Sequence, residues 1–69
     1  MKLFDRYPTL RKVIVNLKTE RAFRGVVWQK KRTHLILRNA ELIKPDGATV
    51  RMDGEVLLMA DNIDFVQVL

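Results

Sequence analysis

The stretch Arg21-Ala-Phe-Arg-Gly-Val-Val-Trp-Gln-Lys30 decides the fold of this chain. Its β-branched and aromatic residues are typical of a strand, and Gly25 interrupts that strand near its middle. A glycine inside a strand often marks a bulge or a sharp bend, as at the corner of a small barrel. We therefore expect a bent strand over residues 21–30.

Strand patterns continue on both sides of this stretch. Before it, Lys12-Val-Ile-Val-Asn-Leu-Lys18 is rich in β-branched residues and places Val13, Val15 and Leu17 on one face. Thr19-Glu20 is too short for any connection but a hairpin. After it, further strands are predicted over residues 34–43, 50–59 and 63–69. Lys44-Pro-Asp-Gly47 is the clearest turn, and Gly54 predicts a bulge or kink inside the fourth strand.

Five strands joined by short hairpins cannot lie flat and still enclose a core. The sequence therefore predicts an all-β fold, a small and strongly bent five-stranded antiparallel barrel over residues 11–69. Residues 1–10 form a leader. We expect a short helix at its start, and this helix should end before Pro8. The whole chain, 1–69, is predicted to be one domain, because 69 residues cannot build two cores.

Composition excludes several ways of stabilising so small a domain. The chain has no cysteine and one histidine, so we expect no disulfide, no metal site and no cofactor. No apolar run approaches a membrane span and no signal peptide opens the sequence, so the cytoplasm is the expected location. Small domains usually need a further source of stability, such as disulfides, a structural metal or a partner subunit, and oligomerisation is the one that remains.

Charge is divided unevenly along the chain. Residues 1–38 contain eleven Lys and Arg against two acids, whereas residues 39–69 contain two against six. A basic half suits a polyanion such as a nucleic acid, although a small soluble domain also needs net charge somewhere.

The last two predicted strands lack the protection that exposed edges normally carry. Val56-Leu-Leu-Met59 is apolar on both faces, and Phe65-Val-Gln-Val-Leu69 has neither charge nor proline. Either both strands are central, or they pair between subunits; we favour the second, which gives a head-to-tail contact able to close into a ring. The predicted oligomer interface consists of Val56, Leu58, Phe65, Val66 and Val68.

The order and spacing of these segments resemble the Sm and Sm-like family, which includes the bacterial RNA chaperone rings. The first Sm motif is similar to residues 13–18, 23–27, 35–37 and 40–41, and the second to residues 54–58, 61–63 and 65–66. The resemblance covers roughly residues 10–69. It is that of a divergent member of the family, one that a phage or virus could encode. It implies a short N-terminal helix, a five-stranded bent barrel and a homo-oligomeric ring of roughly six or seven copies.

The resemblance also implies RNA binding at two inner-rim loops, and here this chain departs from the pattern. His34 occupies the place of the family's base-binding Asn, and Lys30 or Lys31 that of its Asp. Met59-Ala60 replaces the usual Arg-Gly, although Asp61-Asn62 is kept. Uridine specificity is therefore not carried over.

A nucleic-acid site is nevertheless predicted at these loops. Consecutive cations, repeated around a ring, attract a phosphate backbone; in an isolated domain they simply keep a turn solvated. The histidine could contact a base or bond a neighbouring backbone group, and the Asp-Asn pair is also common in turns. The predicted nucleic-acid-binding residues are Lys30, Lys31, Arg32, His34, Asp61 and Asn62.

The sequence holds no motif for catalysis, so we expect no enzyme. It has no cysteine or serine nucleophile and no glycine-rich phosphate loop. Two functions remain. One is a ring that binds single-stranded RNA with low sequence specificity; the other is a structural or assembly ring that binds protein partners and no RNA. For Trp28, the only tryptophan, packing or a subunit contact is favoured over base stacking.

Overall fold

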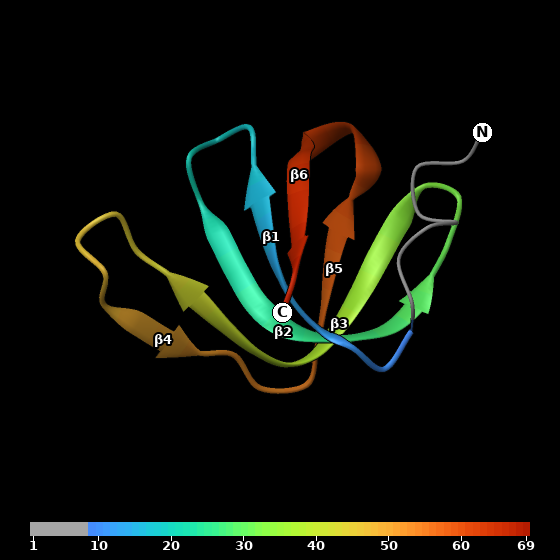
Figure 1. The fold of residues 1–69 in the computed structure, drawn as a ribbon, viewed down its shortest axis with the longest axis horizontal. Coiled ribbons are helices and arrows are strands. Elements are labelled where there is room, and N and C mark those ends of the chain that lie inside the picture. The colour runs from blue at the N-terminus through green and yellow to red at the C-terminus, as the bar shows by residue number, and fades with distance from the viewer. Residues whose placement is uncertain (1–8) are drawn as a thin grey trace.

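The computed structural model describes residues 9–69, which form one antiparallel sheet of six strands bent into a deep cradle (Figure 1). The strands are β1 (Lys12–Leu17), β2 (Ala22–Lys30), β3 (His34–Ile43), β4 (Thr49–Arg51), β5 (Glu55–Met59) and β6 (Ile63–Val68). They are ordered β4-β3-β2-β1-β6, and β5 pairs with the first half of β3.

The strand predicted over residues 50–59 is two strands, so the fold has six strands rather than five. The chain leaves β4 after Arg51 and turns at Gly54, whose φ of 74° lies in the left-handed region. β4 pairs with the second half of β3 and β5 with the first half. The backbone N–H of Met52 still donates to the Ala40 carbonyl at 2.9 Å, which holds the connection against the sheet.

The barrel is not closed. β4 and β5 pair only with β3, along the same side of it, and β6 pairs only with β1. The sheet therefore leaves two edges, one formed by β4 and β5 and one by β6, without a neighbour among the described residues. The predicted five-stranded barrel is therefore corrected to a bent six-stranded sheet that is not closed, and the open edges expected from the sequence are present. The helix predicted for the leader lies outside the described residues. Thr9 and Leu10, the last two residues of the leader, form a turn.

Gly25 lies where the sheet bends most strongly. Arg24 pairs with Glu41 and Val26 with Arg38, so Gly25 faces two residues of β3. One of these, Asn39, has a φ of 52°, which is typical of a bulge. A side chain at Gly25 would lie 3.1 Å from the Ala40 Cα and from the Arg38 carbonyl oxygen, so only glycine lets the strands approach this closely.

We predict that Gly25→Ala lowers the free energy of unfolding by about 1–3 kcal/mol, because both contacts are with backbone and cannot move aside cheaply. Urea denaturation followed by circular dichroism measures it. Thr49→Ala, at an exposed strand position, is the control and should stay within about 0.5 kcal/mol of the parent. Equal stability of Gly25→Ala and the parent would contradict the close approach.

The core lies inside the cradle and follows the alternation expected from the sequence. Val13, Val15 and Leu17 of β1 are buried on one face, as predicted. Further buried side chains from the other strands complete the core: Phe23, Val27, Leu35, Leu37, Ala40, Leu58 and Ile63.

Candidate nucleic-acid interface

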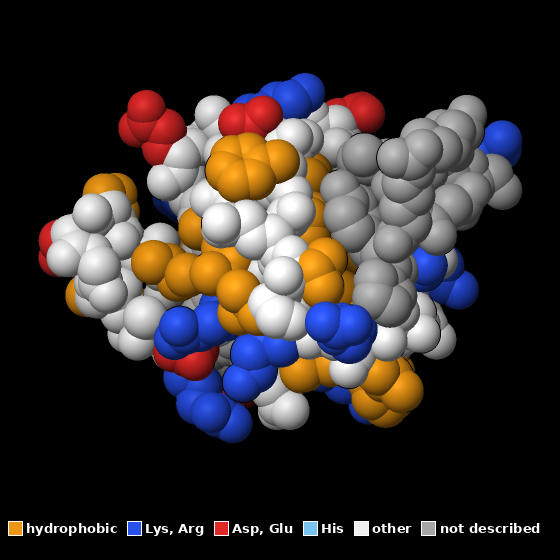
Figure 2. Space-filling view, in the orientation of Figure 1, with side chains coloured by type: hydrophobic (Ala, Val, Ile, Leu, Met, Phe, Trp, Pro, Cys, Tyr) orange, Lys and Arg blue, Asp and Glu red, His pale blue; other side chains and the backbone are white. Residues whose placement is uncertain are grey.

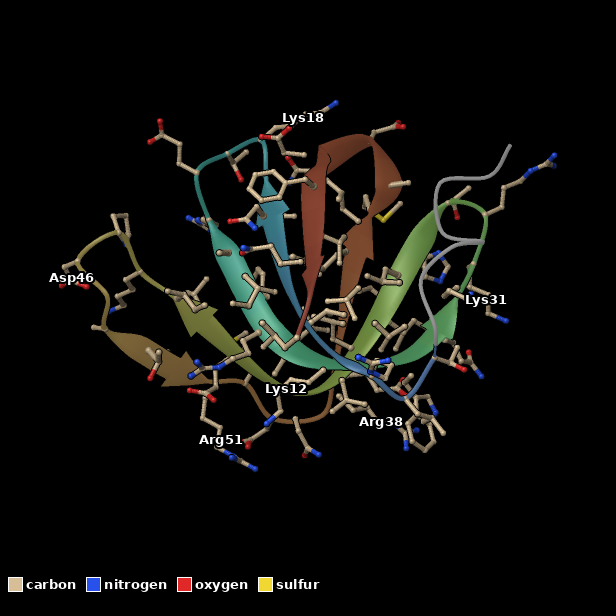
Figure 3. All side chains as sticks on the ribbon, viewed as in Figure 1. Lys12, Lys18, Lys31, Arg38, Asp46 and Arg51 are labelled. Atoms are coloured by element: carbon tan, nitrogen blue, oxygen red, sulfur yellow. The ribbon has the colours of Figure 1, made fainter. Side chains whose placement is uncertain are left out.

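The cationic loop connects the end of β2 to the start of β3. Lys30 ends β2 and His34 begins β3, and the Lys31 N–H donates to the His34 carbonyl at 2.9 Å, which closes a tight turn. Lys31 and Arg32 are exposed at its tip. Figure 3 shows Lys31 on this loop, on the opposite side of the molecule from the β3–β4 turn that carries Asp46.

The second predicted loop is the short 3₁₀ turn η2 (Ala60–Asn62) between β5 and β6. The backbone N–H of Ala60 donates to the Thr33 carbonyl at 2.9 Å, so this turn is bonded directly to the cationic loop. Its other end is fixed to the β1–β2 turn, because the Lys18 N–H donates to the Asn62 carbonyl at 2.8 Å. Two segments about thirty residues apart in sequence therefore form one continuous surface.

This surface is cationic. The ion pairs within residues 9–69 are Arg24–Glu41 and Arg38–Glu55, and neither involves the loop cations. Among the described residues, Lys30, Lys31 and Arg32 therefore form no ion pair with a carboxylate, and Asp61 of η2 is exposed. The arrangement favours an anionic ligand.

His34 bonds its sequence neighbour. Its Nδ1 lies 3.0 Å from the Thr33 hydroxyl oxygen, and across the sheet it pairs with Met59. The sequence offered two alternatives for this histidine, contact with a base or a bond to a neighbouring backbone group. The partner in the structure is instead a side chain. His34 is half-buried at the start of β3, beside the cationic turn.

The predicted interface residues differ in exposure. Leu58 is buried, and Val56 and Val66 pack against the core. Phe65 and Val68 of the predicted set are exposed on β6. The prediction omitted the outward side chains of β5, Leu57 and Met59, which are 55% and 53% exposed. Their position follows from the alternation of β5, since Val56 and Leu58 point inward.

Apolar side chains thus gather at the two open edges. Figure 2 shows them over the middle of the molecule, where β5 and β6 lie in Figure 1, while Lys and Arg gather along its lower side.

Trp28 does not pack into the core. By strand alternation it shares the outer face of the sheet with Val26, and it is 38% exposed. A second bulge in β2 lies between Val27 and Gln29, at this residue. The guanidinium carbon of Arg38 lies 3.8 Å from the centroid of its ring, a cation–π contact. No local signal predicts this bulge, because Val27 and Trp28 extend the strand pattern without a break.

Two other kinds of site are absent from residues 9–69. No group of three or more His, Cys, Asp or Glu side chains is placed there to hold a metal ion. No helix in this range is long and apolar enough to cross a membrane.

Comparison with known proteins gives a match by structure alone. No family model and no curated protein matches the sequence. Among solved structures, a heptameric archaeal Sm protein superposes with a TM-score of 0.78 over 87% of both chains, at 24% identity. The fold is Sm-like.

Two further structures extend the comparison. The P. aerophilum SmAP1 heptamer matches the Sm-like fold at a TM-score of 0.79 and 24% identity, over 87% of this chain and 80% of that one. A chain of the NatC complex bound to CoA matches at 0.76 and 18% identity, over 87% and 77%. At these identities the likeness concerns the fold. Two of the three proteins are heptamers and the third belongs to a complex.

Proposed function

We propose that this chain assembles into a homo-oligomeric ring of the Sm-like family and binds single-stranded RNA with low sequence specificity. The ring forms when β5 of one subunit pairs with β6 of the next. RNA contacts the surface formed by the β2–β3 loop and η2. The protein acts in the cytoplasm as a binding protein rather than as an enzyme. Its divergence from the family pattern fits a phage or viral origin.

The observation that carries the ring is the pair of open edges. β5 and β6 each have one unpaired side, and both carry exposed apolar side chains. Unprotected apolar edges are a hazard in a monomer and are satisfied when another strand pairs with them. Because the two edges belong to different strands, the contact is head-to-tail and can close into a ring. That two of the fold neighbours are heptamers supports such an assembly.

The contact with RNA follows from the joined loops. The Ala60–Thr33 hydrogen bond brings η2 to the cationic turn, so each subunit presents Lys30, Lys31 and Arg32 beside Asp61 and Asn62. We propose that the cations contact phosphates, and that His34 and Asn62 contact base edges. Repetition around a ring multiplies weak contacts into useful affinity.

Native mass spectrometry before and after nuclease treatment tests this function. We expect a closed oligomer that carries co-purified RNA and releases it at high salt. A monomer at micromolar concentration would contradict the ring, and an oligomer that binds no added RNA would contradict RNA binding.

Neutralising the loop should weaken RNA binding and its salt dependence together. For Lys30→Gln/Lys31→Gln/Arg32→Gln, we expect the slope of log affinity against log salt to fall by about 0.7 for each phosphate that the loop no longer neutralises. Fluorescence anisotropy with a labelled single-stranded RNA measures both quantities. Lys44→Gln, in the distant β3–β4 turn, is the control for loss of one positive charge away from the loop, and it is compared with Lys31→Gln alone. If the triple variant has the same slope of log affinity against log salt as the parent, RNA does not contact the β2–β3 loop.

A structural or assembly ring is the second candidate. Met59 is exposed where the Sm motif has Arg, so one family contact to RNA is replaced by an apolar side chain. The similar chain in the NatC complex shows the fold inside a protein assembly. A nucleic-acid-free oligomer in the same mass spectrometry experiment would favour this function.

A further inference from the structure

Two Asp-Gly pairs occur in the sequence, Asp46-Gly47 and Asp53-Gly54. Glycine hinders attack on a preceding aspartate less than any other residue, because it has no side chain beside its amide nitrogen. That nitrogen can bond to the carboxyl carbon of the aspartate and close a five-membered succinimide ring. Both pairs are exposed, and both glycines have a positive φ, 90° at Gly47 and 74° at Gly54. The two sites are therefore matched in residue type, exposure and glycine conformation.

Hydrogen bonds hold both reacting groups of the first pair. The Gly47 N–H donates to the Lys44 carbonyl at 2.9 Å, and the Asp46 Oδ1 accepts from the Ala48 N–H at 2.8 Å. The nitrogen that would attack and the carboxylate that it would attack are thus each bonded to another group. Figure 3 shows Asp46 on this β3–β4 turn. Both bonds must break before the succinimide ring can close.

The second pair lies in the connection between β4 and β5, which Figure 1 shows along the lower side of the cradle. Among the described residues, neither the Gly54 N–H nor the Asp53 carboxylate has a hydrogen-bond or ion-pair partner. A Cβ built at Gly54 would meet nothing within 4 Å, so the space beside this glycine is open. The flanking residues are held instead, because the Met52 N–H is bonded to β3 and Glu55 is paired with it. The pair is a short unbonded segment between two anchored residues.

We propose that Asp53 is a site of spontaneous isoaspartate formation and that its counterpart Asp46 is protected. In the first step the Gly54 nitrogen bonds to Cγ of the protonated Asp53 carboxyl group, and the amide proton and the carboxyl hydroxyl leave as one water molecule. Water then adds to one of the two ring carbonyls. Addition at the main-chain carbonyl breaks its bond to the Gly54 nitrogen, and the chain then runs through Cβ and Cγ. One water is lost and one is gained, so the step needs no other reactant and the product has the mass of the parent.

Isoaspartate at residue 53 adds one carbon atom to the main chain immediately before β5. The pairing of β5 with β3 begins at Glu55 and Arg38, and β5 has only five residues. An extra main-chain atom at this point disturbs the ladder as the extra residue of a bulge does. In the proposed ring β5 carries the subunit contact, so a modified subunit should leave the oligomer. This consequence rests on the proposed function, whereas the modification itself does not.

Incubation of the full chain at physiological temperature and pH, followed by peptide mapping, tests the site. Trypsin cleavage after Arg38 and Arg51 places the two pairs in separate peptides, 39–51 and 52–69. Isoaspartyl methyltransferase labels isoaspartate but not aspartate, and electron-transfer fragmentation assigns the modified residue within each peptide. One hydrogen bond changes the population of the open form by about 2- to 12-fold, and two must break at Asp46, so we expect formation at Asp53 to be at least about fivefold faster. Equal rates, or a faster rate at Asp46, would overturn the proposal.

Unfolding the chain separates the effect of structure from that of neighbouring sequence. In concentrated guanidinium chloride the bonds at Asp46 are lost, so both pairs should react at similar rates. If Asp53 reacts faster by the same factor in the native and the unfolded chain, neighbouring residues decide the rate and the proposal is wrong. Asp53→Glu should remove most of the isoaspartate, because its longer side chain would have to close a six-membered ring. Asp46→Glu is the matched control and should remove little; the reverse result would also refute the assignment.

Size-exclusion chromatography after incubation tests the consequence for assembly. Oligomer and monomer fractions are mapped separately, and we expect isoaspartate at residue 53 to be enriched in the monomer. Asp53→Glu, incubated in the same way, should remain oligomeric. Equal proportions of isoaspartate in both fractions would refute the loss of pairing. A chain that is monomeric before incubation refutes the ring, and the comparison of Asp53 with Asp46 then still decides the modification site.

Discussion

The double variant Leu57→Lys/Phe65→Lys is expected to be a folded monomer. Both side chains point out of the isolated subunit, Phe65 with 51% of its surface exposed, so their replacement should leave the core intact. In the proposed ring, Leu57 on β5 of one subunit approaches Phe65 on β6 of the next. Lysine on an edge strand is a natural means of preventing edge-to-edge pairing. Sedimentation velocity at micromolar concentration measures the change.

The same variant should bind RNA far more weakly, although it carries two additional positive charges. Added cations by themselves strengthen phosphate binding. Loss of the ring removes the simultaneous contacts of several subunits, which are worth about 100- to 10,000-fold in affinity. A fall in affinity in spite of the added charge can therefore be assigned to assembly.

Val50→Lys is the control for this pair. Val50 is a comparable apolar residue, 40% exposed on the other open strand, β4, but it lies outside the predicted interface. It should remain oligomeric. If Val50→Lys dissociates and the double variant does not, the ring is assembled through β4, and the proposed interface is wrong.

Leu37→Ala is expected to lower the free energy of unfolding by about 2–5 kcal/mol. Leu37 is completely buried in β3, at the centre of the core, and pairs with Val27 and Val56 on its two sides. A cavity there cannot close easily, because β3 is the strand that β2, β4 and β5 all pair with. Small domains have little stability to lose, so a large part of the population should unfold at 37 °C.

Urea denaturation of Leu37→Ala at a fixed protein concentration measures this loss. Leu10→Ala removes the same atoms from an exposed position and should change the stability by less than about 0.5 kcal/mol. The comparison is made in the monomeric Leu57→Lys/Phe65→Lys background, so that oligomerisation does not add to the apparent stability. Equal effects of Leu37→Ala and Leu10→Ala would contradict the assigned core.

The interior of the fold can be predicted from the sequence because alternation in a strand is a local property. The pattern of residues 12–18 places Val13 and Val15 in the core, and the third strand is predicted with the bounds it has, His34–Ile43. A bend is expected at Gly25 because glycine has no side chain. In the structure Gly25 lies so close to the backbone of Ala40 that a side chain would not fit. Lys44–Gly47 forms the expected turn, in which the Gly47 N–H donates to the Lys44 carbonyl at 2.9 Å.

The division of residues 50–59 into β4 and β5 cannot be predicted with the same certainty. Gly54 indicates a kink, but whether a kink bends a strand or ends it depends on where the partner strand leads. Here β3 itself bends at Asn39, so no straight strand can pair with its whole length.

The sequence by itself therefore determined the strands, the inward faces and the cationic turn, because each depends on residues close together in the chain. Only the tertiary structure decided which surfaces those elements share. The bond between Ala60 and Thr33, the two open edges and the stacking of Arg38 on Trp28 all join segments distant in sequence. They depend on how the sheet bends at the irregularities of β2 and β3, because the bend decides which distant segments meet.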